Sequence, residues 1–171
     1  MLISIGDSGD TTTIVGLLRA CHDRIRFFTD VANRLTESEA LSAEEVREAA
    51  THVARYFSQA LPLHVADEEQ SLFPRLLERK KELAGVLDEL HREHVSHEAD
   101  VQNLVRLCRA VKEDPSRLAD NRASLSRVIE GLQQGFLAHL HEEETTIFPV
   151  IEALPQDDQN ALLTEFRARR S

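Results

Sequence analysis

The chain has 171 residues, a length that suits one domain able to bury a sizeable core. Its formal net charge of −10 argues against sequence-independent nucleic-acid binding, which needs a basic surface, and against adhesion to an anionic membrane. Gly and Pro are sparse, with 6 and 5 residues, and aromatic residues make up only 5%, so we expect an all-helical protein.

Targeting signals and cysteine usage point to a cytoplasmic protein. No apolar run approaches the roughly 20 residues that span a bilayer. The first seven residues lack the basic region and the long apolar run of a signal peptide. Cys21 and Cys108 do not form a disulfide framework in a chain of this size, and we expect both to pack as small core residues.

Two long helices are expected in the first half of the chain. The first starts at a cap supplied by Asp10 or a threonine at 11–13 and runs to about Leu35. The second opens at the capping box Ser42-x-x-Glu45 and ends at Pro74. Pro62 lies inside its apolar pattern, which predicts a kink near residues 58–61, with two separate helices as the alternative.

Two further long helices are expected at about 83–112, ended by Asp114-Pro115, and at about 120–148. A short terminal helix at about 157–169 could lie across the end of the bundle on Leu162, Leu163 and Phe166. Four long helices with short links predict an all-α, up-down-up-down antiparallel bundle. We expect a single domain over 1–171, with its core at about 11–150.

An eleven-residue motif occurs twice, at 64–74 and at 139–149, and reads H-x-x-x-E-E-x-x-[LI]-F-P both times. Residues i and i+4 share one face of a helix, so each copy directs an imidazole and a carboxylate to one point. The two motif histidines, His64 and His139, are 75 residues apart, and His22 and His94 are 72 apart. A pseudo-twofold relation between the halves would bring both motifs to the same depth of the core.

The motif predicts a paired metal site, because an ionised Glu in an apolar stripe is costly unless it is paired or bound to a cation. Imidazole suits iron, zinc and copper, and carboxylates can bridge two cations. No Glu lies three residues before any of the 8 histidines, which excludes the Glu-x-x-His pattern of ferritin-like sites. The candidate metal ligands are His22, His64, Glu68, His94, His139 and Glu143.

Over residues 14–150 this pattern resembles the hemerythrin-like (HHE cation-binding) family, whose signature is H…HxxxE…H…HxxxE on a four-helix bundle. The resemblance implies that His22, His64 and His139 are ligands, that Glu68 and Glu143 bridge, and that His94 serves from the third helix. It also implies two iron ions joined by an oxo or hydroxo bridge, which bind dioxygen or a related small oxidant. The donor types alone would also accept zinc or manganese.

The third helix leaves alternatives open, because His91, His94 and His97 follow one another at a spacing of three. His94 is centred on the apolar stripe. Resemblance to the oxygen carriers of the family would imply a five-histidine site with two third-helix histidines four residues apart. In this chain the residue four after His94 is Glu98. His91, His97, Glu98 or water could complete the site, and the departure argues against reversible oxygen carriage.

Three functions follow as hypotheses. The first is a non-enzymatic module that binds or senses dioxygen or handles iron. The second is an oxidoreductase that acts on nitric oxide or peroxide or repairs iron–sulfur centres. Resemblance to the repair proteins of the family would imply an added N-terminal segment that contains Cys, whereas here about ten residues without Cys precede the first helix. The third is a zinc-bound or metal-free interaction module. A monomer and a dimer are both compatible with the sequence.

Roles outside the metal site are expected for several neighbours of the motifs. Glu69 and Glu144 should lie in the outer shell or in solvent. Phe73 and Phe148 should close the end of the bundle. His52 and His141 should face solvent, since His141 is rotated by about 200° from His139 on a helix.

Overall fold

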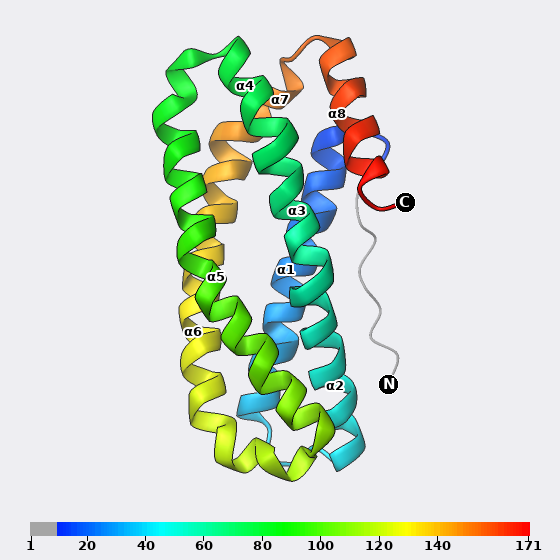
Figure 1. The fold of residues 1–171 in the computed structure, drawn as a ribbon, viewed down its shortest axis with the longest axis vertical. Helices are drawn as coiled ribbons and strands as arrows, with labels where there is room; N and C mark the ends of the chain where they lie inside the picture. The colour runs from blue at the N-terminus through cyan, green and yellow to red at the C-terminus, as the bar shows by residue number, and fades with distance from the viewer. Residues whose placement is uncertain (1–9) are drawn as a thin grey trace.

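The computed structural model describes residues 10–171, and every regular element in that range is helical (Figure 1). Four long helical rods lie side by side: α1 (Ile14–Glu37), a second rod at residues 43–79, α5 (Ala84–Glu113) and a fourth rod at residues 118–152. A shorter helix, α8 (Gln156–Ala168), lies outside the rods near one end. The all-helical class is therefore confirmed. The expectation for the first seven residues lies outside the described part of the chain.

The helix starts follow the capping residues in the sequence. Thr13 caps α1, and its hydroxyl accepts a hydrogen bond from the backbone N–H of Gly16 at 3.0 Å. Ser42 and Glu45 form the predicted capping box, in which the Ser42 N–H donates to Glu45 at 2.9 Å and the Glu45 N–H donates to the Ser42 hydroxyl at 3.3 Å. Both caps satisfy backbone donors that a helix start leaves without partners.

The second rod does not end at Pro74. It consists of α2 (Ala43–Arg55), a π-helical segment Tyr56–Ala60, α3 (Leu61–Asp67), a second π segment Glu68–Leu72 and α4 (Phe73–Arg79). The fourth rod likewise runs through Pro149 as α6 (Leu118–Glu142), a π segment Glu143–Ile147 and α7 (Phe148–Glu152). The predicted Phe-Pro stop of the two motifs was wrong.

The π segments explain why these prolines do not end the rods. Pro62, Pro74 and Pro149 each stand two residues after the end of a π segment. The N–H of the residue before each proline donates a hydrogen bond to the carbonyl five residues earlier, as Phe73 does to Glu68 and Phe148 to Glu143. Proline has no N–H and its ring clashes with the carbonyl four residues back, and a wider turn removes that clash. The rod therefore stays continuous, and the two-helix alternative at Pro62 does not apply.

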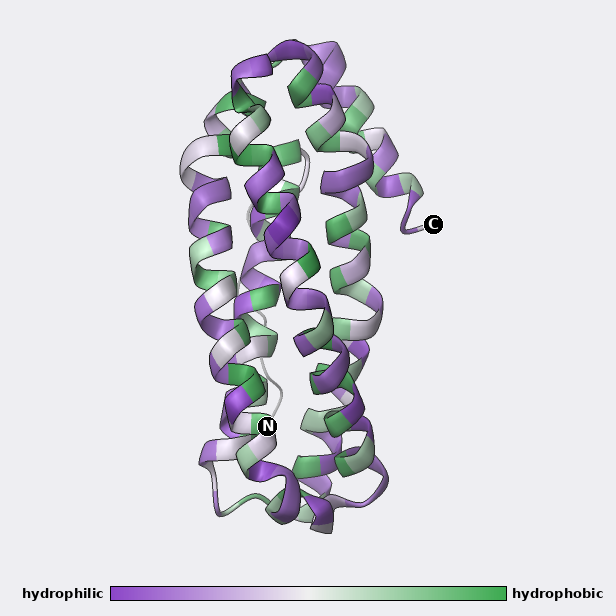
Figure 2. Cartoon of the chain, turned by 60° about the vertical axis from the view of Figure 1, so that its left-hand side comes forward, coloured by the Kyte–Doolittle hydropathy of each residue, from purple (hydrophilic) through white to green (hydrophobic). Residues whose placement is uncertain are grey.

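Two apolar clusters fill the interior, one on each side of a polar layer. One cluster includes Ile25, Phe57, Leu61, Leu104 and Leu140, and the other includes Leu18, Leu72, Leu90, Ile147 and Phe166. His22 lies in sequence between Leu18 and Ile25, one from each cluster, and the two motifs bridge the clusters in the same way. Hydrophilic residues run along every rod (Figure 2), as expected for helices that bury only one face.

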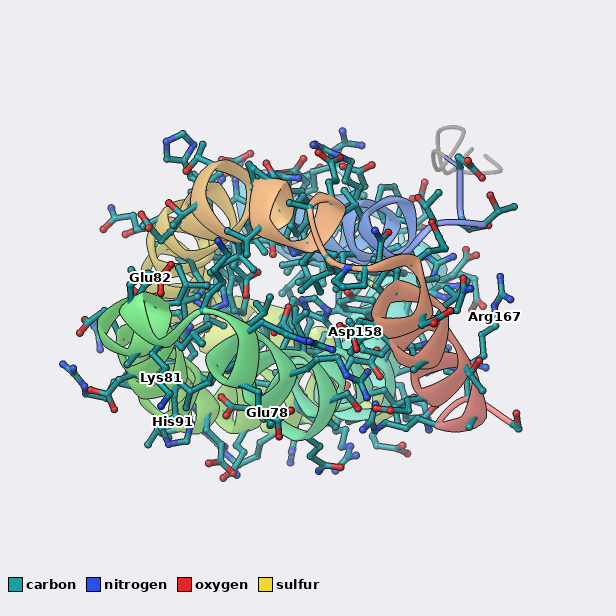
Figure 3. The ribbon with its side chains drawn as sticks, turned by 90° about the horizontal axis from the view of Figure 1, so that it is seen from above. Glu78, Lys81, Glu82, His91, Asp158 and Arg167 are labelled. Carbon is teal, nitrogen blue, oxygen red and sulfur yellow. The ribbon has the colours of Figure 1, made fainter. Side chains whose placement is uncertain are left out.

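α8 packs against α1 and the second rod. Its own residues Leu162 and Phe166 are fully buried, while Leu163 is half-buried. Seen from the end of the molecule, Asp158 points inward from α8 and Arg167 points away (Figure 3). Arg79 of α4 pairs with Asp158 at 2.8 Å. Within residues 10–171, no helix has the combined length and apolarity needed to cross a bilayer.

Candidate metal centre

The six predicted ligands converge in the polar layer and form two overlapping donor groups. One group contains His22, His64, Glu68 and Glu143, and the other contains Glu68, His94, His139 and Glu143. Within each group, the potential ligand atoms all lie within 4.8 Å of one another. All four rods contribute, and both carboxylates belong to both groups. Such a donor set can hold two neighbouring cations.

Each carboxylate divides its two oxygens between the two groups. Glu143 places Oε2 at 3.1 Å from His22 Nε2 and Oε1 at 3.5 Å from His139 Nε2. Glu68 places Oε1 at 3.2 Å from His64 Nε2 and Oε2 at 3.2 Å from His94 Nε2. One oxygen toward each cation is the arrangement that a bridging carboxylate requires.

The burial of these groups tests whether a cation fits. His22, His64, Glu68 and Glu143 are at most 3% exposed. Within the described chain, His22 Nε2, both ring nitrogens of His64, Glu68 Oε2 and both oxygens of Glu143 are buried without a hydrogen-bond partner. Buried polar atoms without partners cost about 1–3 kcal/mol each, more when charged. Cations between the nitrogens and oxygens would satisfy all of these atoms except His64 Nδ1. Mixed imidazole and carboxylate donors suit iron, zinc or manganese.

Outer carboxylates orient three of the four imidazoles. The Nδ1 atoms of His22, His94 and His139 lie 2.9, 2.7 and 2.7 Å from carboxylate oxygens of Glu144, Glu69 and Glu93, respectively. A carboxylate that accepts the Nδ1 proton turns Nε2 toward the metal and makes it a better donor. The expectation that Glu69 and Glu144 lie outside the ligands agrees with this geometry. The outer role of Glu93 was missed, although its place directly before His94 was a visible signal.

Burial and hydrogen bonding move the pKa values of these groups in opposite directions. Burial alone lowers the pKa of His22, but the carboxylates of Glu143 and Glu144 beside its ring outweigh burial and raise the pKa to about 8. Burial, reinforced by the charge of His22, lowers the pKa of His64 to about 3. His139 also has a raised pKa, because contact with Glu143 outweighs burial. The imidazoles are therefore unequal before any metal binds.

The two bridging carboxylates differ for the same reason. Burial, and then the neighbouring charge of Glu143, raise the pKa of Glu68 well above its usual value. Burial would also raise the pKa of Glu143, but the adjacent imidazoles of His139 and His22 outweigh burial and lower it. A pair of cations would neutralise both carboxylates together.

The three other third-helix candidates do not enter either donor group. His91 is exposed on the outside of α5 (Figure 3), and its Nδ1 lies 2.9 Å from Glu69. The His97 ring centroid lies 6.2 Å from that of His139, and Glu98 is exposed. His94 is the member of this helix that lies among the donors, so among residues 10–171 the two donor groups together contain four histidines and no fifth.

The motif phenylalanines do not close the end of the bundle, because each packs against an imidazole. Phe148 stacks on His22 with ring centroids 5.1 Å apart, and Phe73 stacks on His94 at 6.0 Å. Both rings are buried and belong to the apolar cluster beyond the polar layer. This packing fixes the ring planes of the first-rod and third-rod histidines. His52 and His141 lie at the surface as predicted, and both cysteines are buried.

A cavity of about 410 Å³ opens onto one side of the donor groups. It reaches His64, His94 and His139 and does not reach His22, so access from outside favours the second group. Most of its wall is apolar, with side chains from the second rod, α5 and α6. A small ligand could reach the metals by this route.

Comparisons with known proteins agree with this geometry. Residues 13–151 match the hemerythrin HHE cation binding domain. The chain is also 26% identical over 159 residues to an uncharacterized protein of Haemophilus influenzae, covering 91% of this chain and 89% of that protein. The domain implies metal binding, with iron as its characteristic metal, and the clustered His and Glu side chains agree with that. The chain therefore belongs to the hemerythrin HHE cation-binding family.

Proposed function

We propose that the protein is a di-iron module that binds or senses dioxygen or a related small oxidant, without turnover. The main observation that supports this proposal is that Glu68 and Glu143 each place one carboxylate oxygen beside a histidine of each donor group. The ligands are His22 and His64 at one iron and His94 and His139 at the other, with both carboxylates shared. When bound, the iron pair supplies electrons and a position for a small ligand.

The rest of the chain supports such a centre. Short links at 38–42, 80–83 and 114–117 join consecutive rods, which favours an up-down-up-down antiparallel bundle forming one domain. Apolar clusters cover the polar layer on both sides along the bundle. Glu144, Glu69 and Glu93 hold three ring protons at Nδ1, so that the Nε2 atoms stay available to metal. The wide cavity gives a small ligand access to the second iron.

Metal analysis and visible spectra test the proposal. Protein purified from iron-supplemented cells should contain two irons per chain and show a visible absorption that bleaches with dithionite and returns in air. One metal per chain, zinc in place of iron, or a spectrum indifferent to reduction and air would contradict it. His52→Ala serves as the control variant, since His52 is exposed and belongs to neither donor group.

An oxidoreductase is the second candidate, and the cavity is the observation that favours it, because it gives substrates direct access to His94 and His139. Nitric oxide and peroxide are the substrates to assay. Steady-state rates well above those of free iron, lost in His94→Ala and retained in His52→Ala, would establish turnover. Rates equal to free iron would leave the binding module as the function.

A further inference from the structure

The cavity beside the metal centre is far larger than dioxygen requires. Its volume is about 410 Å³, whereas a water molecule, which is close to dioxygen in size, occupies about 30 Å³. Pockets that hold organic ligands measure about 300–1,000 Å³. The cavity therefore has the size of an organic binding site, and access for a diatomic molecule does not account for it.

The wall of the cavity favours an apolar ligand with aromatic character. Phe57 and Phe136 line it with their ring planes nearly parallel, at 9° and 6.2 Å between centroids. Leu61, Val65 and Val101 complete much of the remaining wall. Apolar surface transferred from water to such a wall is stabilised by roughly 25 cal/mol per Å², and aromatic rings prefer offset or edge contacts with other rings.

One polar group in the wall is free to orient a ligand. The His97 ring lies edge-on to Phe136 at 5.2 Å, and it makes no side-chain hydrogen bond within residues 10–171. Gly135 makes room for it, because a Cβ at that position would overlap the His97 ring. A glycine inside a helix costs about 1 kcal/mol relative to alanine, so the space beside His97 has a cost in helix stability.

The rim of the cavity disfavours anions. Glu69 and Glu98 both line it, and the whole chain has a formal net charge of −10. An anionic ligand would approach against this charge, since like charges in a low-dielectric cleft repel more strongly than in water. An uncharged molecule meets no such barrier.

From the size, lining and charge of this cavity, we propose that it binds an uncharged, apolar organic molecule of aromatic size, placed beside the metal pair with its polar group at His97. This site goes beyond the proposed binding of a small oxidant and does not require the metals to be present. Binding can therefore be measured on metal-free and metal-loaded protein separately.

A matched pair of fluorescent probes tests the size and charge of the ligand. N-phenyl-1-naphthylamine is neutral, and 1-anilinonaphthalene-8-sulfonate has the same ring system with an added sulfonate. The neutral probe should bind with one site per chain and at least about tenfold more tightly than the anionic probe. Equal affinities, or no saturable binding of the neutral probe, would overturn the proposal.

Two substitutions to tryptophan locate the site. Val101→Trp fills the cavity and should weaken binding of the neutral probe by more than about tenfold, whereas Leu137→Trp adds the same ring at a side chain that is 54% exposed and outside this cavity and should leave binding unchanged. Equal effects of the two variants would count against the site. Circular dichroism checks that both variants fold.

Histidine ring resonances of the wild-type protein give a readout that needs no variant. In metal-free protein, saturating neutral probe should shift the signals of the histidines that line the cavity and leave those of His52 and His141 in place; the lining histidines are His64, His91, His94, His97 and His139. Shifts confined to His52 and His141 would show that the probe binds elsewhere and would refute the proposal.

Discussion

The two halves of the molecule, residues 14–79 and 84–152, repeat the ligands of the metal centre but differ in what surrounds them. His22 corresponds to His94, His64 to His139, and Glu68 to Glu143. In each half the carboxylate after the bridging Glu accepts the ring proton of a histidine on another rod: Glu69 from His94 and Glu144 from His22. The repeat therefore includes an outer shell as well as the donors.

The differences begin one residue before the first-rod and third-rod histidines. Glu93 precedes His94 and binds His139 Nδ1, whereas the equivalent position before His22 is Cys21, and His64 Nδ1 has no partner within the described chain. The outer carboxylates also differ in their second partner. Glu144 pairs with Arg26 at 2.7 Å, whereas Glu69 pairs with His91 at 2.9 Å. A repeated donor set can thus give two unequal metal positions.

The bridging carboxylates provide the strongest test of this inequality. Glu68→Gln and Glu143→Gln should each lower affinity for both metals, by at least about 100-fold, because each removes a shared ligand and outer-shell losses alone cost about 10–100-fold. Titration followed by elemental analysis measures this. Loss of only one metal in either variant would contradict the bridging role.

The same two variants should have opposite effects on the metal-free protein. Glu68 has a pKa raised by burial, so its ionised form costs stability at neutral pH, and Gln removes that cost. Glu143 has a lowered pKa, so its charge contributes stability above the unfolded pKa that is lost as pH falls through the folded pKa. At pH 7 we expect Glu68→Gln to stabilise and Glu143→Gln to destabilise by about 1–3 kcal/mol. Urea unfolding measures both, and shifts of the same sign would refute the asymmetry.

Outer carboxylates give the next largest effect. Glu93→Gln should lower metal affinity about 10–100-fold, because it removes the acceptor that orients His139. Glu98→Gln on the same helix is the matched control, since Glu98 is exposed and outside both donor groups. Competition with a chelator compares the two, and similar losses would show that general charge, and not orientation, sets the affinity.

The contact between the second rod and the two arginines that follow α8 concerns only the first half, and it affects stability without involving a metal ligand. Asp67, directly before Glu68, is fully buried and pairs with Arg169 at 2.9 Å and Arg170 at 2.6 Å, whereas the equivalent Glu142 is exposed. Asp67→Asn should destabilise the protein by about 1–3 kcal/mol, less than for a fully buried pair because both arginines are partly exposed.

Glu142→Gln is the matched control for that prediction and should change stability by less than about 0.5 kcal/mol. Thermal unfolding of both variants, with and without metal, measures the difference. If Asp67→Asn unfolds at the wild-type temperature, the ion pairs to α8 do not hold the second rod.

Much of the fold and of the site could be predicted from the sequence. Local signals predicted the helix starts, such as the Ser42 and Glu45 capping box and the Thr13 cap. The i,i+4 spacing of His and Glu predicted that the two side chains share one face of a helix, because helix geometry fixes which residues share a face. The helix ends at Pro74 and Pro149 were mispredicted, since a π segment can absorb a proline and its formation depends on packing along the rod as well as on the proline itself.

The sequence by itself determined the all-helical class, the repeated donors and their placement in the core, because these follow from periodicity and from the cost of burying charge. Only the tertiary structure decided which oxygen of Glu68 and Glu143 faces which imidazole, and that Phe73 and Phe148 stack on histidines. It also decided that His91, His97 and Glu98 line a cavity beside the donor groups and belong to neither group. These outcomes depend on how four separate rods are rotated against one another, and residue spacing along one chain does not fix that rotation.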